Sequence, residues 1–166
     1  YRKYRAMVDL LGSKYLGRNT MLYIVDGLFG GGSDETRGPV KYLMPPFNNH
    51  WSSSIFISQD QVALESVCFD FLRTEWDGKN THDPSNAIWE WVPNMPGVDD
   101  YLHQAADSKN WPDGIIYDPD NSGLPMPSLG VHEHWNNPFD MQYSGNLGRQ
   151  NGITLVRVDG NIVKRT

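Results

Sequence analysis

The sequence predicts an α/β fold: a layered, mostly parallel sheet with flanking helices and long irregular loops. Two short apolar runs, at residues 21–25 and 54–57, are typical of strands, and the first reads as a strand buried on both faces. Helical patterns of apolar residues precede the first run and follow the second, at residues 3–11 and 60–75. Because helices and strands mix in this order, layers of helix and sheet are favoured over a β-sandwich.

The rest of the chain is predicted to hold less regular structure. Residues 27–49 and 76–97 contain many glycines, prolines and asparagines without a sustained period, which is typical of loops. A short helix is expected from residue 98 or 99 to residue 106, with the carboxylates of Asp99 and Asp100 favourably placed in its positive first turn. A last strand is expected from residue 153 to residue 158. Long loops therefore separate the predicted elements.

Length and composition favour one domain, spanning residues 1–166. The chain has 166 residues, of which 39% are hydrophobic, and this is enough for one sizeable core. It opens at Tyr1 without an initiating methionine and enters a helical pattern almost at once. We therefore expect a fragment or a processed product of a longer protein.

Charge and hydropathy exclude two classes of partner. The formal net charge is −6, and a protein that binds nucleic acid needs an excess of lysine and arginine on some face. No run of 18 apolar residues occurs, so no membrane span is predicted. The sequence therefore predicts neither nucleic-acid binding nor a transmembrane segment.

Cys68 is the single cysteine of the chain. One thiol cannot form an internal disulfide or supply the four thiolates that an iron–sulfur cluster normally needs, so no such cluster is expected within this chain. Cys68 falls inside the apolar pattern of the predicted helix, which favours a small buried hydrophobic residue over a nucleophile.

Two aspartates follow the two predicted strands, and both are candidate catalytic residues. Asp26 comes directly after the first strand and Asp60 shortly after the second. If the strands are parallel neighbours, both carboxylates face one crevice at the carboxyl edge of the sheet. The alternatives are structural: Asp26 with Gly27 is an ordinary turn pair, and Asp60 is an ordinary helix N-cap.

The densest polar cluster lies at residues 130–137 and predicts a metal site. In an extended segment His132 and His134 point to the same side, so the two imidazoles could bind one divalent metal ion such as zinc. His103 is the first choice for a further ligand, with Asp26 and Asp60 as the other candidates. Either Glu133 or Asp60 would then act as general base, with the metal activating a water molecule. Histidines held in hydrogen-bond networks are the structural alternative.

Six tryptophans are many for a chain of this length. Five of them fall in or beside predicted loops: Trp76, Trp89, Trp91, Trp111 and Trp135. Exposed rings among polar residues would suit a carbohydrate, whereas rings packed onto the core would anchor the loops. A glycan or another small molecule is therefore a second candidate ligand.

Four separated segments together resemble a bacterial subgroup of the domain of unknown function 362 family. They are Leu22 to Leu28, Phe56 to Val67, Gly97 to His103 and Ser128 to Asn137. The resemblance implies a longer parent protein, of which this chain is the C-terminal portion and whose missing N-terminal half would be its partner. It also implies a subgroup that is often exported to the periplasm or the exterior, but it implies no activity. The family pattern has proline after the second aspartate, where this chain has Gln61.

These observations support one leading hypothesis and two alternatives. The leading hypothesis is an exported α/β protein with a polar, metal-dependent and hydrolytic site. The first alternative is a non-catalytic module that binds glycans or surfaces through loop tryptophans. The second is one chain of a processed structural protein.

Overall fold

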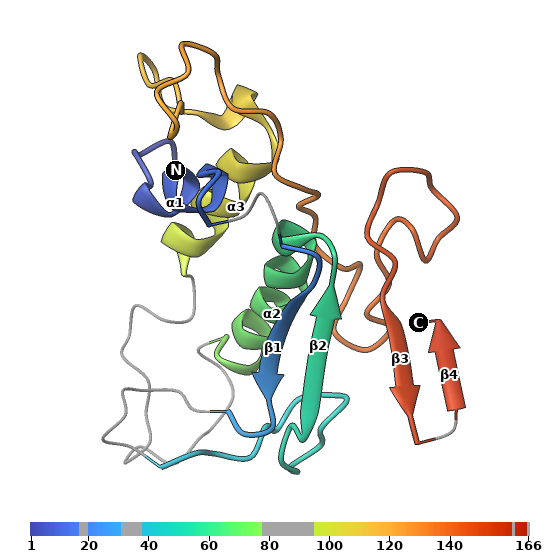
Figure 1. Ribbon diagram of the computed structural model, residues 1–166. Helices are drawn as coiled ribbons and strands as arrows, with labels where there is room; N and C mark the ends of the chain where they lie inside the picture. Colours follow the sequence, from blue (N-terminus) through green and yellow to red (C-terminus); the bar gives the residue numbers. More distant parts are fainter. Residues whose placement is uncertain (17–19, 31–37, 78–94, 161, 166) are drawn as a thin grey trace.

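The computed structural model describes residues 1–16, 20–30, 38–77, 95–160 and 162–165 (Figure 1). These residues form helices, one short 3₁₀ helix and two β-hairpins: α1 (Ala6–Gly12), α2 (Gln61–Glu75), α3 (Pro96–Ala106), η3 (Ser108–Asn110), β1 (Tyr23–Gly27), β2 (Ser54–Ser58), β3 (Val156–Asp159) and β4 (Ile162–Arg165). None of the helices in this described part is both long and apolar enough to cross a membrane.

The prediction of a layered, mostly parallel sheet is wrong. β1 pairs with β2 in an antiparallel two-stranded sheet, with Val25 opposite Phe56, and β3 pairs with β4 in a second antiparallel sheet. The apolar runs located the strands, but an apolar run carries no information about the direction of its partner. The pairing shows that the two strands run in opposite directions, whereas parallel neighbours would need a crossover connection between them.

β1 is also not buried on both faces, contrary to the prediction. Its residues alternate between half-buried and exposed, as do those of β2. Ile24 is 61% exposed, and its partner Ile57 on β2 is 58% exposed. The opposite face of the sheet packs onto the helical part of the molecule, where Phe56 contacts Phe71 of α2. One face of the hairpin is therefore covered and the other is open.

Helix α2 is the central element of the structure. It begins at its N-cap Asp60, whose Oδ1 accepts a hydrogen bond of 2.9 Å from the backbone N–H of Ala63. Several of its faces are buried, because three separate apolar clusters meet the helix. The α2 residues in these clusters are Val62, Ala63, Val67, Phe69, Phe71 and Leu72.

Helices α1 and α3 lie together near the N-terminal end of α2 (Figure 1). Their shared core contains Val8 of α1 and Leu102 of α3, both fully buried, and Tyr117 from the following segment. Arg5, just before α1, donates from Nε to Asp100 of α3 at 2.8 Å. These contacts fix the position of α3, which carries part of the polar centre described below.

Candidate metal centre

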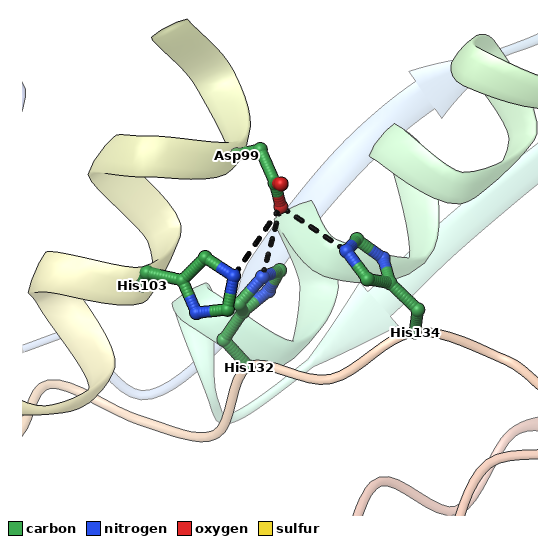
Figure 2. A group of neighbouring side chains, drawn as sticks. All are labelled: Asp99, His103, His132 and His134. Carbon is green, nitrogen blue, oxygen red and sulfur yellow. Dashed lines mark hydrogen bonds and ion pairs between the residues drawn. The ribbon is translucent and has the colours of Figure 1, made fainter. Parts of the chain in front are cut away.

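A carboxylate and three imidazoles converge between α3 and the extended segment at residues 131–135 (Figure 2). The four side chains are Asp99, His103, His132 and His134, and one ligand atom from each lies within 4.8 Å of all the others. Oδ1 of Asp99 is 3.2 Å from Nε2 of His132, 3.1 Å from Nε2 of His134 and 3.8 Å from Nε2 of His103. This group could hold a metal ion.

Local structure explains why these four side chains meet. Asp99 and His103 are four residues apart on α3, so they lie on the same face one helical turn apart. His132 and His134 alternate along an extended segment and point to the same side, with ring centroids 4.9 Å apart. The structure thus brings together the three histidines that the sequence analysis selected as ligands.

The second nitrogen of His132 is engaged by Ser66 of α2. Its Nδ1 lies 2.8 Å from Oγ of Ser66, and that hydroxyl donates its own proton to the carbonyl of Val62 at 2.6 Å. The serine oxygen must therefore accept from an Nδ1–H of His132. Once Nε2 gives up the proton through which it bonds Asp99, its electron pair is directed at the centre of the group.

His134 is oriented in the same way by Asp70. Nδ1 of His134 donates to Oδ1 of Asp70 at 2.8 Å, which leaves Nε2 facing Asp99. A carboxylate that holds the far nitrogen of a histidine is the usual outer partner of a metal ligand, because it fixes the tautomer and makes the imidazole more basic. Both His132 and His134 are therefore set to present Nε2.

Asp70 is itself held rigidly. Its side chain is fully buried, and beside His134 it accepts hydrogen bonds from Nε of Arg73 at 2.6 Å, from the backbone N–H of Trp135 at 3.0 Å and from the hydroxyl of Tyr143 at 2.8 Å. A buried carboxylate needs such partners, since an unpaired buried charge is very costly. Asp70 thus connects α2 to the segment that carries the two histidines.

The carboxylates give the centre a potential that favours cations. The hydrogen bond to Asp70, followed by the one to Asp99, raises the pKa of His134 to about 9. Burial alone would raise the pKa of Asp99, but hydrogen bonds from His132, His134 and the hydroxyl of Tyr1 hold it well below its usual range. The negative charges of Asp70 and Asp99, which stabilise the protonated form of His134, would stabilise a metal cation as well.

His103 differs from the other two histidines. Its pKa is lowered, chiefly by burial and then by the neighbouring His132, while Asp99 acts in the opposite direction. Its ring packs edge-on against the ring of His132 at a centroid distance of 4.4 Å. It therefore supplies a neutral nitrogen near neutral pH, which is the form that binds metal.

The candidate catalytic carboxylates are not members of the ligand group. Asp26 is exposed and accepts from the backbone N–H of Leu28 at 2.9 Å, as expected of a turn residue. Asp60 caps α2 and also accepts from the backbone N–H of Val131 at 2.9 Å. The prediction that these two share one sheet edge is wrong, because the antiparallel pairing puts the ends of β1 and β2 at opposite ends of the sheet.

Glu133 points to the other side of the extended segment from the two histidines that flank it. Its carboxylate accepts from the backbone N–H of Ile153 at 2.6 Å and from the backbone N–H of Ser144 at 3.3 Å, and it also bonds the Ser144 hydroxyl. These contacts connect residue 133 to the C-terminal loop. The carboxylates of Asp60 and Glu133 are thus both engaged in hydrogen bonds that hold the backbone.

Two of the loop tryptophans are core residues. Trp76 and Trp135 are each only 6% exposed and belong to apolar clusters. Trp111 is half-buried and donates from its indole nitrogen to the carbonyl of Gln104 at 2.9 Å. Trp89 and Trp91 lie outside the described residues. Rings that anchor loops in this way are not presented as a binding face.

Sequence reasoning missed three members of the centre: Asp99, Asp70 and Ser66. Asp99 was interpreted only as a favourable charge in the first turn of a helix. Its spacing of four from His103 on that helix was the signal that could have identified it. Asp70 and Ser66 stand inside the apolar pattern of α2, and only the folded structure shows that the histidines approach them there.

No protein-family model matches this chain, and no curated protein or solved structure matches it. The resemblance to the domain of unknown function 362 family therefore stays a prediction. The geometry of the centre is the remaining evidence for a function.

Proposed function

We propose that this protein binds one divalent transition-metal ion of the zinc type at Asp99, His103, His132 and His134, and that it uses the metal in a hydrolytic reaction. One observation carries the proposal. Three imidazole Nε2 atoms surround a single carboxylate oxygen, and the outer nitrogens of His132 and His134 are already engaged by Ser66 and Asp70. A cation between these atoms would replace the protons that they otherwise have to share.

The spacing of the ligand atoms supports tetrahedral coordination. Bonds of about 2.0–2.1 Å to nitrogen and oxygen place neighbouring ligands of a tetrahedral zinc ion about 3.4 Å apart. The separations from Oδ1 of Asp99 to the three Nε2 atoms, 3.1, 3.2 and 3.8 Å, lie around that value. The separations among the three histidine nitrogens are all within 4.8 Å.

The ligand types favour zinc or a neighbouring transition metal over calcium or magnesium. Three imidazoles and one carboxylate form a nitrogen-rich set, whereas calcium and magnesium take oxygen ligands almost throughout. Cobalt, nickel and iron accept similar ligands, so occupancy in the cell would also depend on supply. We therefore write the ion as zinc-like.

A zinc-like ion would supply the chemistry that the protein residues around the site lack. Such an ion would act as a Lewis acid. It would lower the pKa of a water molecule that takes the place of one of the four ligands to roughly 7, giving a hydroxide nucleophile at neutral pH. This requires neither Asp60 nor Glu133 as general base, which agrees with their structural hydrogen bonds. Hydrolysis of an ester, amide or phosphoester is the corresponding reaction class.

Metal content is the direct test of the proposal. Protein purified without chelator, stripped and then titrated with zinc by calorimetry, is expected to bind one ion per chain. The His132→Ala, His134→Ala double variant should lose that binding, while His50→Ala, which changes an exposed histidine far from the group, should keep it. Equal and negligible metal in all three proteins would rule out the metal centre.

A further inference from the structure

The four ligands of the proposed centre are not held equally. The side chain of His132 is 1% exposed, that of Asp99 12% and that of His134 26%, whereas the side chain of His103 is 43% exposed. His103 therefore forms the side of the centre that faces solvent. Anything that reaches the metal from outside would arrive at this ligand.

The hydrogen-bond partners divide the ligands in the same way. Ser66 holds His132, Asp70 holds His134, and the Tyr1 hydroxyl bonds Oδ2 of Asp99. Within the part of the chain that the structure describes, no hydrogen bond is made to Nδ1 of His103. Ligands with an outer partner are oriented before the metal arrives, and loss of such a partner typically weakens metal binding about 10–100-fold.

Distance gives a third difference. The Nε2 atoms of His132 and His134 lie 3.2 and 3.1 Å from Oδ1 of Asp99, and that of His103 lies 3.8 Å away. Three ligand atoms thus form a tight set, and the fourth lies farther out on the exposed side. Catalytic zinc sites have three protein ligands and one exchangeable position, whereas structural sites have four fixed ligands.

We infer that His103 is an exchangeable ligand, so that Asp99, His132 and His134 hold the metal and the fourth position opens to an oxygen donor. In the resting protein His103 or water occupies this position, and in a reaction a carbonyl or phosphoryl oxygen of the substrate takes it. This inference rests on the proposed metal centre and assigns it a catalytic type of coordination. No covalent bond is made or broken in the exchange; one ligand leaves the metal as another binds.

Cobalt-substituted protein tests the inference, because the visible bands of Co²⁺ report its coordination number and ligands. Four samples are compared with Co²⁺ alone and then with added azide as a small-anion probe: the parent protein, His103→Ala, His132→Ala and His50→Ala. Circular dichroism of each variant checks that it is folded. His103→Gln provides a second variant that preserves side-chain volume and polarity.

We expect azide to change the visible spectrum of the parent protein in a saturable one-to-one titration. His103→Ala and His103→Gln should still bind one Co²⁺, with an affinity reduced by about tenfold or less, while His132→Ala should lose more than about 100-fold. His50→Ala should behave as the parent does. The solvent-facing ligand would then be dispensable and the buried one essential.

Two results would overturn the inference while leaving the metal centre in place: loss of Co²⁺ in the His103 variants as complete as in His132→Ala, or a parent spectrum that azide leaves unchanged. Either would show a closed site with four fixed ligands. If the parent protein takes up no Co²⁺ and no zinc, the proposed function itself fails, and the inference fails with it.

Discussion

The polar centre and the outer face of the β1–β2 hairpin are built in opposite ways. Around the centre, the buried carboxylates are paired: Asp70 has four hydrogen-bond partners and Asp99 has its two closest histidines and a tyrosine. On the outer face of the hairpin, Ile24, Ile55 and Ile57 are each about 60% exposed. In the centre, buried charged groups have hydrogen-bond partners, whereas on the outer face of the hairpin apolar side chains face water.

The difference indicates which part of the molecule this chain specifies by itself. The residues that hold the ligands by hydrogen bonds, Tyr1, Ser66 and Asp70, all belong to this chain, so the ligand geometry needs no further chain. The hairpin face is an apolar patch of a kind that is often covered by another segment or partner. The expectation of a missing N-terminal half stays a prediction.

The largest expected effect comes from the buried carboxylate behind His134. Asp70→Ala removes an acceptor shared by four donors, and breaking a buried charge network of this kind typically costs about 3–5 kcal/mol in the free energy of unfolding. Urea denaturation measures the loss. We also expect zinc affinity to fall about 10–100-fold, because His134 loses its outer partner.

Asp113→Ala is the matched control for that change. Its carboxylate is fully exposed and forms only a long ion pair with Arg2, at 3.9 Å. Exposed pairs contribute about 0–1 kcal/mol, so this variant should unfold almost as the parent protein does. Similar urea midpoints for Asp70→Ala and the parent would show that the polar centre does not stabilise the fold as described.

Metal should stabilise the same region by mass action. An ion that binds only the folded protein, at a free concentration of 100 times its Kd, adds about 2.7 kcal/mol to the free energy of unfolding. The measurement compares thermal melts with zinc and with chelator. We expect no shift in the His132→Ala, His134→Ala double variant; an equal shift in that variant would assign the stabilising zinc to another site.

Acid should weaken the connection between the N-terminal segment and α3. Burial raises the pKa of Asp100, but hydrogen bonds from Gln104, Arg5 and the backbone of residues 2 and 3 outweigh it and lower the pKa to about 2. Because the folded pKa is below the ordinary value, this stabilisation is present above about pH 4 and is lost as pH falls toward 2. By linkage it contributes on the order of 2 kcal/mol.

Asp100→Asn separates this effect from the titration of other carboxylates. Urea midpoints are measured from pH 2 to pH 6 for both proteins. The variant should be less stable at pH 6, and the difference from the parent should shrink toward pH 2. A difference that stays constant over this range would mean that Asp100 acts through packing and not through its charge.

The sequence located most regular elements but not the pairing of the strands. Helix α2 was recognisable from its N-cap Asp60 and its apolar pattern. Both were correct: Asp60 caps the helix by accepting from the backbone of Ala63, and apolar residues of the pattern such as Val62 and Val67 are buried. The antiparallel hairpin was missed because strand direction depends on how the chain returns, which no local pattern encodes. The apolar run at residues 21–25 was also a poor guide to burial, since Ile24 is exposed.

The site was accessible to sequence reasoning only where its residues are close along the chain. His132 and His134 were recognised because alternate residues of an extended segment share a face. Asp99, the residue at which all three histidines meet, comes from another element some thirty residues away and appeared to be an ordinary helix-start charge. Tertiary packing decides which distant carboxylate joins the histidines, so Asp99 could be identified as a ligand only from the structure.

The smallest expected effect concerns the exposed face of the hairpin. Ile57→Thr preserves a β-branched side chain in the strand but removes apolar surface from a position that is 58% exposed. Because that side chain packs little in the fold, we expect the free energy of unfolding to change by no more than about 0.5 kcal/mol. Binding of a fluorescent apolar dye should decrease, since the patch becomes smaller. Urea denaturation and dye titration give the two readouts.

Phe56→Ala, on the neighbouring residue, tests whether the two faces differ as described. Phe56 points to the covered face, with its ring 5.5 Å from that of Phe71, so its truncation should cost about 2 kcal/mol or more. A similar cost for Ile57→Thr would mean that the outer face is buried in solution, and therefore that a second chain covers it. If only Phe56→Ala is destabilising, the hairpin has one packed face and one open face in solution, as its exposed isoleucines indicate.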